Sequence, residues 1–287
     1  MLIWIGYAGN ELLRRRILPV TLALTALFLG LIGFVLHRVA GAGDTEDMSL
    51  FFQAGTAMVL GLYFAQLLSA FFVLFSTMGT ISGEIESGLM LAMLARPIPR
   101  WKMYLGKWLG FAFWCLLYHA LLFWSIVILV RVFLNAPLLP DAVWKGFGLF
   151  ECLPLLLLAL SLLGSTALPA IGNGVACAML LGLSMFSGLL ENVFDSSKAH
   201  AGISNFAFYV SLLMPSDAIF RRMIYELLGG SALPLTPETD KMMGPFSSMG
   251  PFSLSNLPSA AFVVYAAVYL VALVAWGCAR FQRKDIA

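Results

Sequence analysis

Residues 152–190 read CLPLLLLALSLLGSTALPAIGNGVACAMLLGLSMFSGLL, an uncharged run of 39 residues between Glu151 and Glu191. As one helix this run would be roughly 58 Å long, about twice the thickness of the hydrocarbon core of a bilayer. It must therefore fold back on itself. Pro169 and Gly172-Asn173-Gly174 are residues that tight turns favour. The run predicts two membrane-spanning helices with a reversal at 169–174.

The rest of the chain has the same character. A second uncharged run, of 36 residues, lies between Asp47 and Glu84, and charged residues make up 11% of the chain, against about 25% in soluble domains. The net charge of +2 gives no reason to expect nucleic acid as a partner. We predict an all-α membrane protein with one domain, 1–287, and six spans. They lie at about 17–38, 51–79, 104–133, 143–168, 171–190 and 257–279.

Basic residues predict the orientation of these spans. If the N-terminus is inside, ten of the 17 lysines and arginines fall in short segments close to the inner membrane surface. By the positive-inside rule, this bias favours cytoplasmic N- and C-termini, and the even number of spans agrees. The ten residues are Arg14, Arg15, Arg16, Arg96, Arg100, Lys102, Lys107, Arg280, Arg283 and Lys284.

Two segments outside the spans have their own patterns. Residues 1–16 combine aromatic side chains with three arginines, which favours a helix lying in the inner membrane interface over a ragged start to the first span. The apolar stretch that follows is about 20 residues long, too long for the core of a secretory signal. Residues 191–256 are expected outside, as two short helices and an irregular loop, 229–256. Ser216 is predicted to cap the second helix, in which Arg222 and Glu226 pair.

The loop 80–103, between the second and third spans, carries the most concentrated polar motif. Ser82 or Gly83 can cap a helix whose first turn holds Glu84 and Glu86. Pro97 disfavours helix at Arg96, so the predicted helix covers about 84–95. Aromatic and basic residues then form an interface anchor at the start of the third span: Arg100, Trp101, Lys102, Lys107 and Trp108. These residues alone support two hypotheses equally. The helix docks to a soluble partner, or it lies on the membrane surface.

Three motifs in and after this loop resemble a known family. They are Glu84-Ile85-Glu86-Ser87-Gly88, Ala95-Arg96-Pro97-Ile98-Pro99-Arg100 and Gly106-Lys107-Trp108-Leu109-Gly110. Together they resemble the signature of permeases of the type-2 ABC exporter class. The resemblance extends to the outer motif Pro215, Asp217 and Arg221 and to the closing segment 281–286. It is strongest to a branch named for the maturation of multi-copper enzymes.

The resemblance implies that the loop is a cytoplasmic coupling helix that docks onto an ATPase subunit. The implied coupling residues are Glu84, Glu86, Gly88, Leu89, Arg96, Pro97 and Arg100. The chain has no Gly-x4-Gly-Lys-Ser/Thr motif, so we expect no enzyme activity, catalytic residue, cofactor or metal in it. ATP and Mg²⁺ would bind to a separate ATPase chain. The resemblance also places the chain in a prokaryotic inner or plasma membrane.

The function expected from these features is that of a permease subunit exporting or extracting a hydrophobic or amphipathic substrate. A second copy or a homologous permease would complete the pathway. Gly55, Gly61, Ala65 and Ser69 share roughly one face of the second span, and such small residues permit close helix approach, so we expect the dimer contact there. The alternatives are an ABC-type energy transducer that remodels a partner without transport, and a membrane protein that has no ATPase.

Several other polar residues invite functional hypotheses. His119 lies within the third span, and we expect it to be hydrogen-bonded to a neighbouring helix. Glu151 and Arg131 are expected near the outer ends of spans, where they would reach the interface. Methionines of the outer loop together with His200 could form a soft Cu(I) site, but loop methionines more often pack. A serine nucleophile would have only His119 as its base, which argues against a protease.

Overall fold

The computed structural model describes residues 2–41, 47–90, 99–134, 139–194, 201–228 and 258–283, and within these ranges the regular structure is entirely helical. The fold class is therefore the predicted one. The helices are α1 (Leu2–Arg14), α2 (Ile17–Ala40), α3 (Asp47–Thr77), α4 (Ser82–Glu86), α6 (Arg100–Leu134), α7 (Pro140–Ser165), α8 (Ala170–Phe194), α9 (Ala201–Leu213), α10 (Ser216–Leu227) and α12 (Ala260–Arg283).

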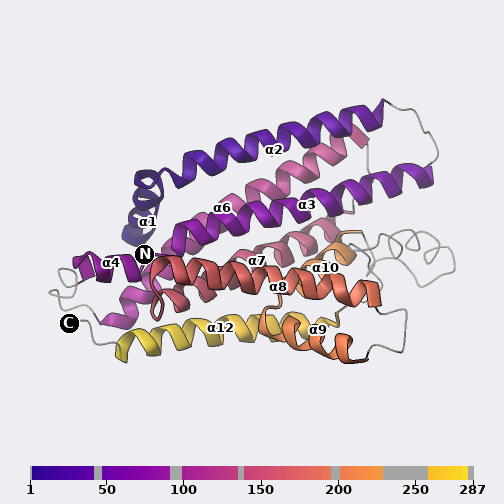
Figure 1. The fold of residues 1–287 in the computed structure, drawn as a ribbon. Helices are drawn as coiled ribbons and strands as arrows, with labels where there is room; N and C mark the ends of the chain where they lie inside the picture. The colour runs from indigo at the N-terminus through magenta and orange to yellow at the C-terminus, as the bar shows by residue number, and fades with distance from the viewer. Residues whose placement is uncertain are drawn as a thin grey trace.

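Six helices in the described ranges are long and apolar enough to cross a membrane, which confirms the predicted spans. They are α2, α3 with its continuation to Glu86, α6, α7, α8 and α12. Figure 1 shows them running alongside one another in a single bundle. The four-residue turn between α7 and α8 returns the chain to the bundle at the end where it left, so these two helices run in opposite directions.

Burial divides the bundle into a centre and a rim. In α3 and α7, 61% of the most apolar window is buried inside the subunit, against 6% in α2 and 17% in α12. The centre contains Leu122, Phe123, Phe150 and Leu158, all fully buried. The rim helices instead expose apolar side chains, as expected where a lipid phase or a second membrane subunit covers them.

The reversal between α7 and α8 lies slightly earlier than predicted. Residues 166–169 form the turn, and the N–H groups of Ala167 and Leu168 both donate to the carbonyl of Gly164. The segment 172–174 belongs to α8. There the Asn173 side-chain amide donates to the carbonyls of Met78 and Ser161 at 2.9 and 2.8 Å. Asn173 therefore joins three helical segments instead of making the turn.

The segment after α8 contains the two predicted short helices, but α10 lies deeper than expected. It packs against α7, α8 and α12, and most of its side chains are buried. Pro215, not Ser216, occupies the N-cap position, and the Ser216 hydroxyl instead lies 3.1 Å from that of Ser184. The predicted pair of Arg222 and Glu226 is present at 2.6 Å. The predicted irregular loop lies outside the described residues.

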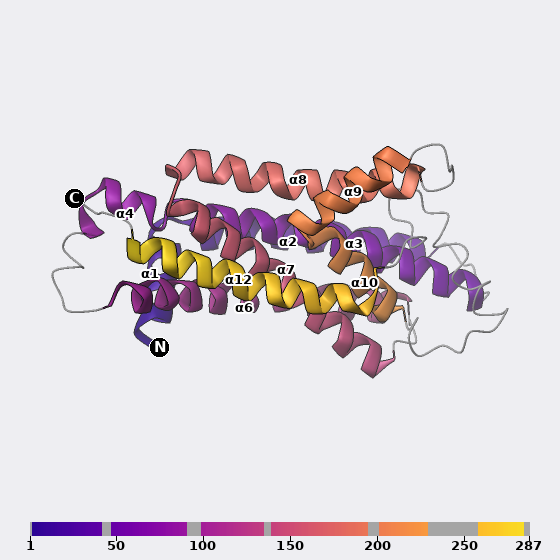
Figure 2. The ribbon, with the colours of Figure 1, turned by 90° about the horizontal axis from the view of Figure 1, so that it is seen from below.

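The two ends of the bundle carry different structures. One end, here called the α4 end, holds α1, α4, the start of α6, the end of α12 and the turn between α7 and α8 (Figures 1 and 2). The opposite end, here called the α9 end, holds α9 and α10. Every described member of the predicted cytoplasmic set of basic residues belongs to segments at the α4 end. A cytoplasmic location of that end stays a prediction.

Candidate functional site

The predicted coupling helix is interrupted. Helix α4 ends at Glu86, and Ser87 and Gly88 form a turn before helical backbone resumes at Leu89. Gly88 has φ +73°, a left-handed conformation that glycine adopts without steric cost. The prediction of one helix over 84–95 was therefore wrong. Residues 91–98, with the proposed coupling residues Arg96 and Pro97, lie outside the described part of the chain.

Glu84 is a buried ion-pair partner. Its side chain is only 6% exposed, and one carboxylate oxygen contacts the ammonium group of Lys107. Lys107, itself 2% exposed, also donates to the carbonyl of Thr80 at 3.3 Å. Burial of either charge alone would be strongly unfavourable, so the two groups depend on each other. Glu84, an implied coupling residue, is therefore not on the surface that a partner could contact, and the expectation of Lys107 as an interface anchor was wrong.

Helix α1 contributes a third member to this cluster. The Tyr7 hydroxyl donates to the other carboxylate oxygen of Glu84 at 2.7 Å, and the Lys107 ammonium lies 5.9 Å from the centre of the Tyr7 ring. Burial and the adjacent negative charge of Glu84 raise the pKa of the Tyr7 phenol. Tyr7 therefore stays protonated, and a hydrogen-bond donor, at any physiological pH. We call Tyr7, Glu84 and Lys107 the junction triad.

Two glycines allow α1 to lie directly on α6. A Cβ atom at Gly110 would lie 2.6 Å from the backbone carbonyl oxygen of Trp4, and one at Gly106 would collide with the Trp4 ring. The Trp114 indole N–H in turn donates to the carbonyl of Ile5 at 3.0 Å. The motif Gly106-Lys107-Trp108-Leu109-Gly110 thus has a physical role that sequence reasoning missed. Its glycines admit α1, and its lysine pairs with α4.

The segment at α4 is also fixed to α7. The Ser165 hydroxyl accepts hydrogen bonds from the backbone N–H groups of Ile81 and Ser82, each at 3.1 Å. One turn earlier, the Thr77 hydroxyl donates to that of Ser161 at 2.8 Å. Short helix α4 is consequently joined to three longer helices: to α1 through Tyr7, to α6 through Lys107 and to α7 through Ser165.

The outer surface of this junction is formed by other predicted residues. Glu86, Gly88 and Leu89 are exposed, with Leu89 at 58%, whereas Met90 is fully buried. Trp101 is exposed, while Arg100 and Trp108 are half-buried. An exposed leucine beside an exposed carboxylate is what a soluble partner could contact. The carboxylate of Glu84 and the ammonium group of Lys107 are buried and out of reach of such a partner, whereas Tyr7 is partly exposed.

The stripe predicted to form a dimer contact lies inside the subunit. Gly55, Gly61, Ala65 and Ser69 are all buried. A Cβ atom at Gly61 would lie 3.1 Å from Ile126 of α6 and 3.7 Å from Ile32 of α2. Small residues here permit packing within one chain, so this stripe is not available to a second copy. A dimer that uses other surfaces stays a prediction.

Two ionisable residues within the bundle also differ from expectation. His119 is fully buried and stacks on Phe150 with ring centres 3.7 Å apart, and neither ring nitrogen has a hydrogen-bond partner among the described residues. Glu151 lies about 16 Å along α7 from its start, with both carboxyl oxygens buried and without a partner in the described ranges. It therefore does not reach the interface.

The other polar residues considered above have different outcomes. Arg131 lies exposed in the last turn of α6, as predicted. His200 and the loop methionines are outside the described residues.

Comparison with known protein families agrees with this architecture. A family model described as "ABC-2 family transporter protein" matches residues 8–286. The chain belongs to the ABC-2 transporter family. No functionally curated protein matches it. The matched region contains Glu84, Lys107 and all six candidate spans, so this ABC-2 protein is a multi-pass permease subunit of an ABC transporter.

Proposed function

We propose that this ABC-2 permease couples ATP hydrolysis in a separate ATPase chain to the export or extraction of a hydrophobic or amphipathic substrate. The observation that carries the proposal is the buried contact between Glu84 and Lys107, which joins α4 to a membrane-spanning helix. ATP and Mg²⁺ bind to the ATPase chain, and this permease performs no hydrolysis itself. The α4 end faces the cytoplasm.

The two glutamates of the motif have different roles in this mechanism. Glu86 and Leu89 are exposed and form part of the docking surface for the ATPase. Glu84 is buried and transmits movement of that surface to α6 through Lys107. Gly88 lies between the two docking residues, and its left-handed backbone forms the turn at the end of α4.

Transmission requires contacts that move together instead of breaking. An ion pair in a low-dielectric interior resists separation because each charge would be left uncompensated, at about 3–5 kcal/mol. The hydrogen bonds of Tyr7 and Ser165 extend the same rigid unit to α1 and α7. A displacement of α4 therefore moves the ends of several helices at once, which is how a rigid-body change of the bundle can begin.

The substrate pathway forms between this subunit and a second permease, either another copy or a homologue. Among the described residues, the centre of one subunit is filled by packed side chains such as Phe123 and Phe150, so we place the pathway between subunits. The exposed apolar faces of the rim helices would form the pathway walls. An uncharged wall suits a substrate with a large apolar part.

The test compares the two glutamates in a complex of permease and ATPase reconstituted in lipid vesicles. E86A with L89D should weaken assembly, measured as the ATPase concentration needed for half-maximal binding. E84Q should leave assembly unchanged while substrate no longer stimulates ATP hydrolysis, because the contact with Lys107 loses its charge. An E84Q complex that keeps full stimulation would refute the transmitting role, and unchanged assembly of E86A with L89D would refute the docking surface.

A further inference from the structure

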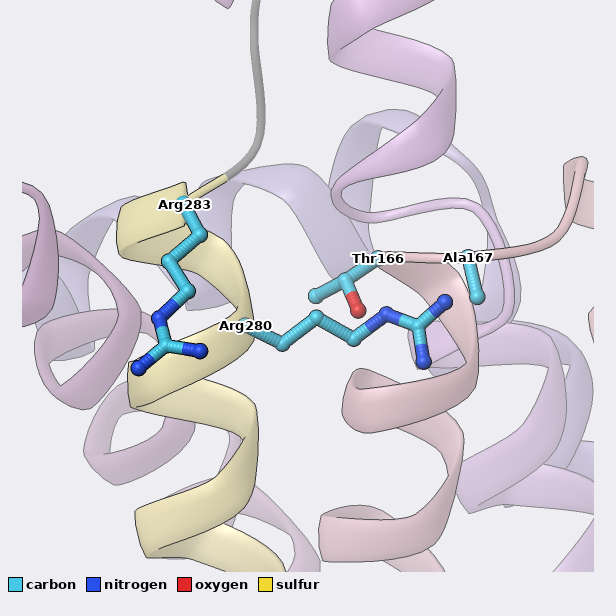
Figure 3. A pocket seen from close by; sticks show the side chains of 4 residues that line it. All are labelled: Thr166, Ala167, Arg280 and Arg283. Atoms are coloured by element: carbon cyan, nitrogen blue, oxygen red, sulfur yellow. The ribbon is translucent and has the colours of Figure 1, made fainter.

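A pocket at the α4 end lies apart from the junction triad. Thr166 and Ala167, from the turn after α7, and Arg280 and Arg283, from the last turns of α12, line a cavity of about 350 Å³. Figure 3 shows Arg280 extended from α12 across the gap towards Thr166 and Ala167, while Arg283 extends along the other side of the α12 helix. Both arginines therefore line the pocket, but only Arg280 extends into the gap between the two helices.

The polar groups of the turn are already used. The Thr166 hydroxyl donates to the carbonyl of Leu163 at 2.7 Å, and the N–H groups of Thr166 and Ala167 donate to the carbonyls of Leu163 and Gly164. Within the described part of the chain, neither arginine forms an ion pair. Among the described groups that line the pocket, the two guanidinium groups are thus the ones available to bind a ligand. Guanidinium groups match phosphate oxygens in geometry and charge.

The end of α7 explains only part of this arrangement. The negative end of a helix dipole attracts a nearby cation, and Arg280 lies at the end of α7 (Figure 3). Arg283 extends in another direction and gains nothing from that dipole. A ligand that occupies the opening would contact Arg280 directly and Arg283 at its edge.

The position of the pocket along α12 indicates where that ligand comes from. Arg280 lies 20 residues after Ala260, or about 30 Å along the helix, which equals the thickness of a bilayer core. Trp276, one turn before Arg280 on the same helical face, is 58% exposed. Exposed tryptophan next to arginine is typical of the level of lipid headgroups.

We propose that this pocket binds the phosphate group of an anionic phospholipid, in the leaflet that surrounds the α4 end. Arg280 makes the principal contact and Arg283 a weaker one. Basic pockets between helices on the cytoplasmic side bind anionic headgroups in this way. The inference does not depend on an ATPase or on the transported substrate.

The test measures lipids retained by the purified full-length chain. The wild type is equilibrated with equal amounts of phosphatidylglycerol and phosphatidylcholine, and bound lipids are counted by native mass spectrometry. We expect a preference for phosphatidylglycerol that falls about fivefold in R280Q and less in R283Q. R131Q, which removes an exposed arginine from the opposite end of α6, should keep the full preference.

Each alternative outcome is informative. Equal retention of both lipids by the wild type, or an unchanged preference in R280Q, would overturn the proposal. Displacement of phosphatidylglycerol by excess inorganic phosphate would show that the pocket binds a soluble anion, and would overturn the proposal that it binds a lipid. If R280Q does not fold, R280K decides. R280K keeps the charge but not the planar guanidinium group, so its preference for phosphatidylglycerol should lie between those of the wild type and R283Q. R131Q is the reference for an unchanged preference. If R280K equals R131Q, Arg280 is not the principal contact.

Discussion

The two ends of the bundle both contain buried ion pairs, but at one end the pair connects two helices and at the other the pairs lie within one helix. At the α4 end, Glu84 and Lys107 are 23 positions apart in sequence and belong to different helices. At the α9 end, the pairs of Asp217 with Arg221 and of Arg222 with Glu226 lie four positions apart within α10. The first pair joins two helices, whereas the others lie within one. Under the proposed mechanism, only a buried pair that crosses between elements transmits movement.

The largest difference between the ends should appear when one partner is removed. E84A leaves the Lys107 ammonium buried and uncompensated, so we expect a loss of about 3–5 kcal/mol in the free energy of unfolding. E226A leaves Arg222, which is 22% exposed on its side chain and can reach water, and should cost about 1 kcal/mol or less. Unfolding of both variants in mixed detergent micelles measures the two losses. Equal losses would remove the distinction between the ends.

The next largest effect concerns the contact of α1 with α6. G110A places a Cβ atom against the backbone of Trp4, which cannot rotate away, so we expect about 1–3 kcal/mol of destabilisation. G148A is the matched control in α7, because nothing lies within 4 Å of its Cβ position. Accessibility of a cysteine placed at Ala8, buried in the wild type, would report whether α1 separates. Protection of that cysteine in G110A would contradict the tight contact.

A smaller effect is expected for Y7F. It removes the hydrogen bond to Glu84, but Tyr7 is partly exposed and water can replace the donor, so the cost should be about 0.5–1.5 kcal/mol. Burial raises the Tyr7 pKa in the folded protein. The contribution of Tyr7 is therefore fully present below the unfolded-state pKa of about 10 and is lost only as the pH rises through the higher folded-state value. The difference between wild type and Y7F should not change between about pH 6 and pH 9. A decline of this stability difference within that pH window would contradict the claim that Tyr7 acts as a protonated hydrogen-bond donor.

The smallest effect should come from R222Q in α10. Its pair with Glu226 is local, so the expected loss is about 0.3–0.5 kcal/mol, and substrate-stimulated ATP hydrolysis should stay at the wild-type level. A strong loss of stimulation in R222Q would show that the α9 end also transmits movement.

The sequence predicts the spans well because each is a long apolar run, and it predicts the pair of Arg222 and Glu226 because spacing within a helix fixes which side chains meet. It does not predict the junction triad, since nothing local relates Tyr7, Glu84 and Lys107. The paired glycines 106 and 110 were the available signal, because glycines four apart on a span indicate close approach of another element. That signal does not say which element approaches.

The remaining errors have similar causes. Small residues on α3 indicate close packing but not whether the neighbour is in the same subunit, and Gly61 packs against Ile126 of its own chain. The predicted helix 84–95 includes Gly88, because the sequence does not determine the sign of its φ angle. Conversely, Gly172 and Gly174 were read as turn residues although they lie in α8, where Gly174 faces the Met78 side chain. Sequence alone does not show which of these arrangements a glycine adopts, because glycine allows all of them.

The central claim is that Glu84 and Lys107 transmit movement of α4 as a pair. Charge reversal tests it most directly, in the reconstituted complex of permease and ATPase. E84K and K107E should each abolish substrate-stimulated ATP hydrolysis, and the swapped variant E84K/K107E should recover a substantial part of it because the ion pair forms again with opposite polarity. A folded swapped variant that is as uncoupled as either single variant would contradict the account.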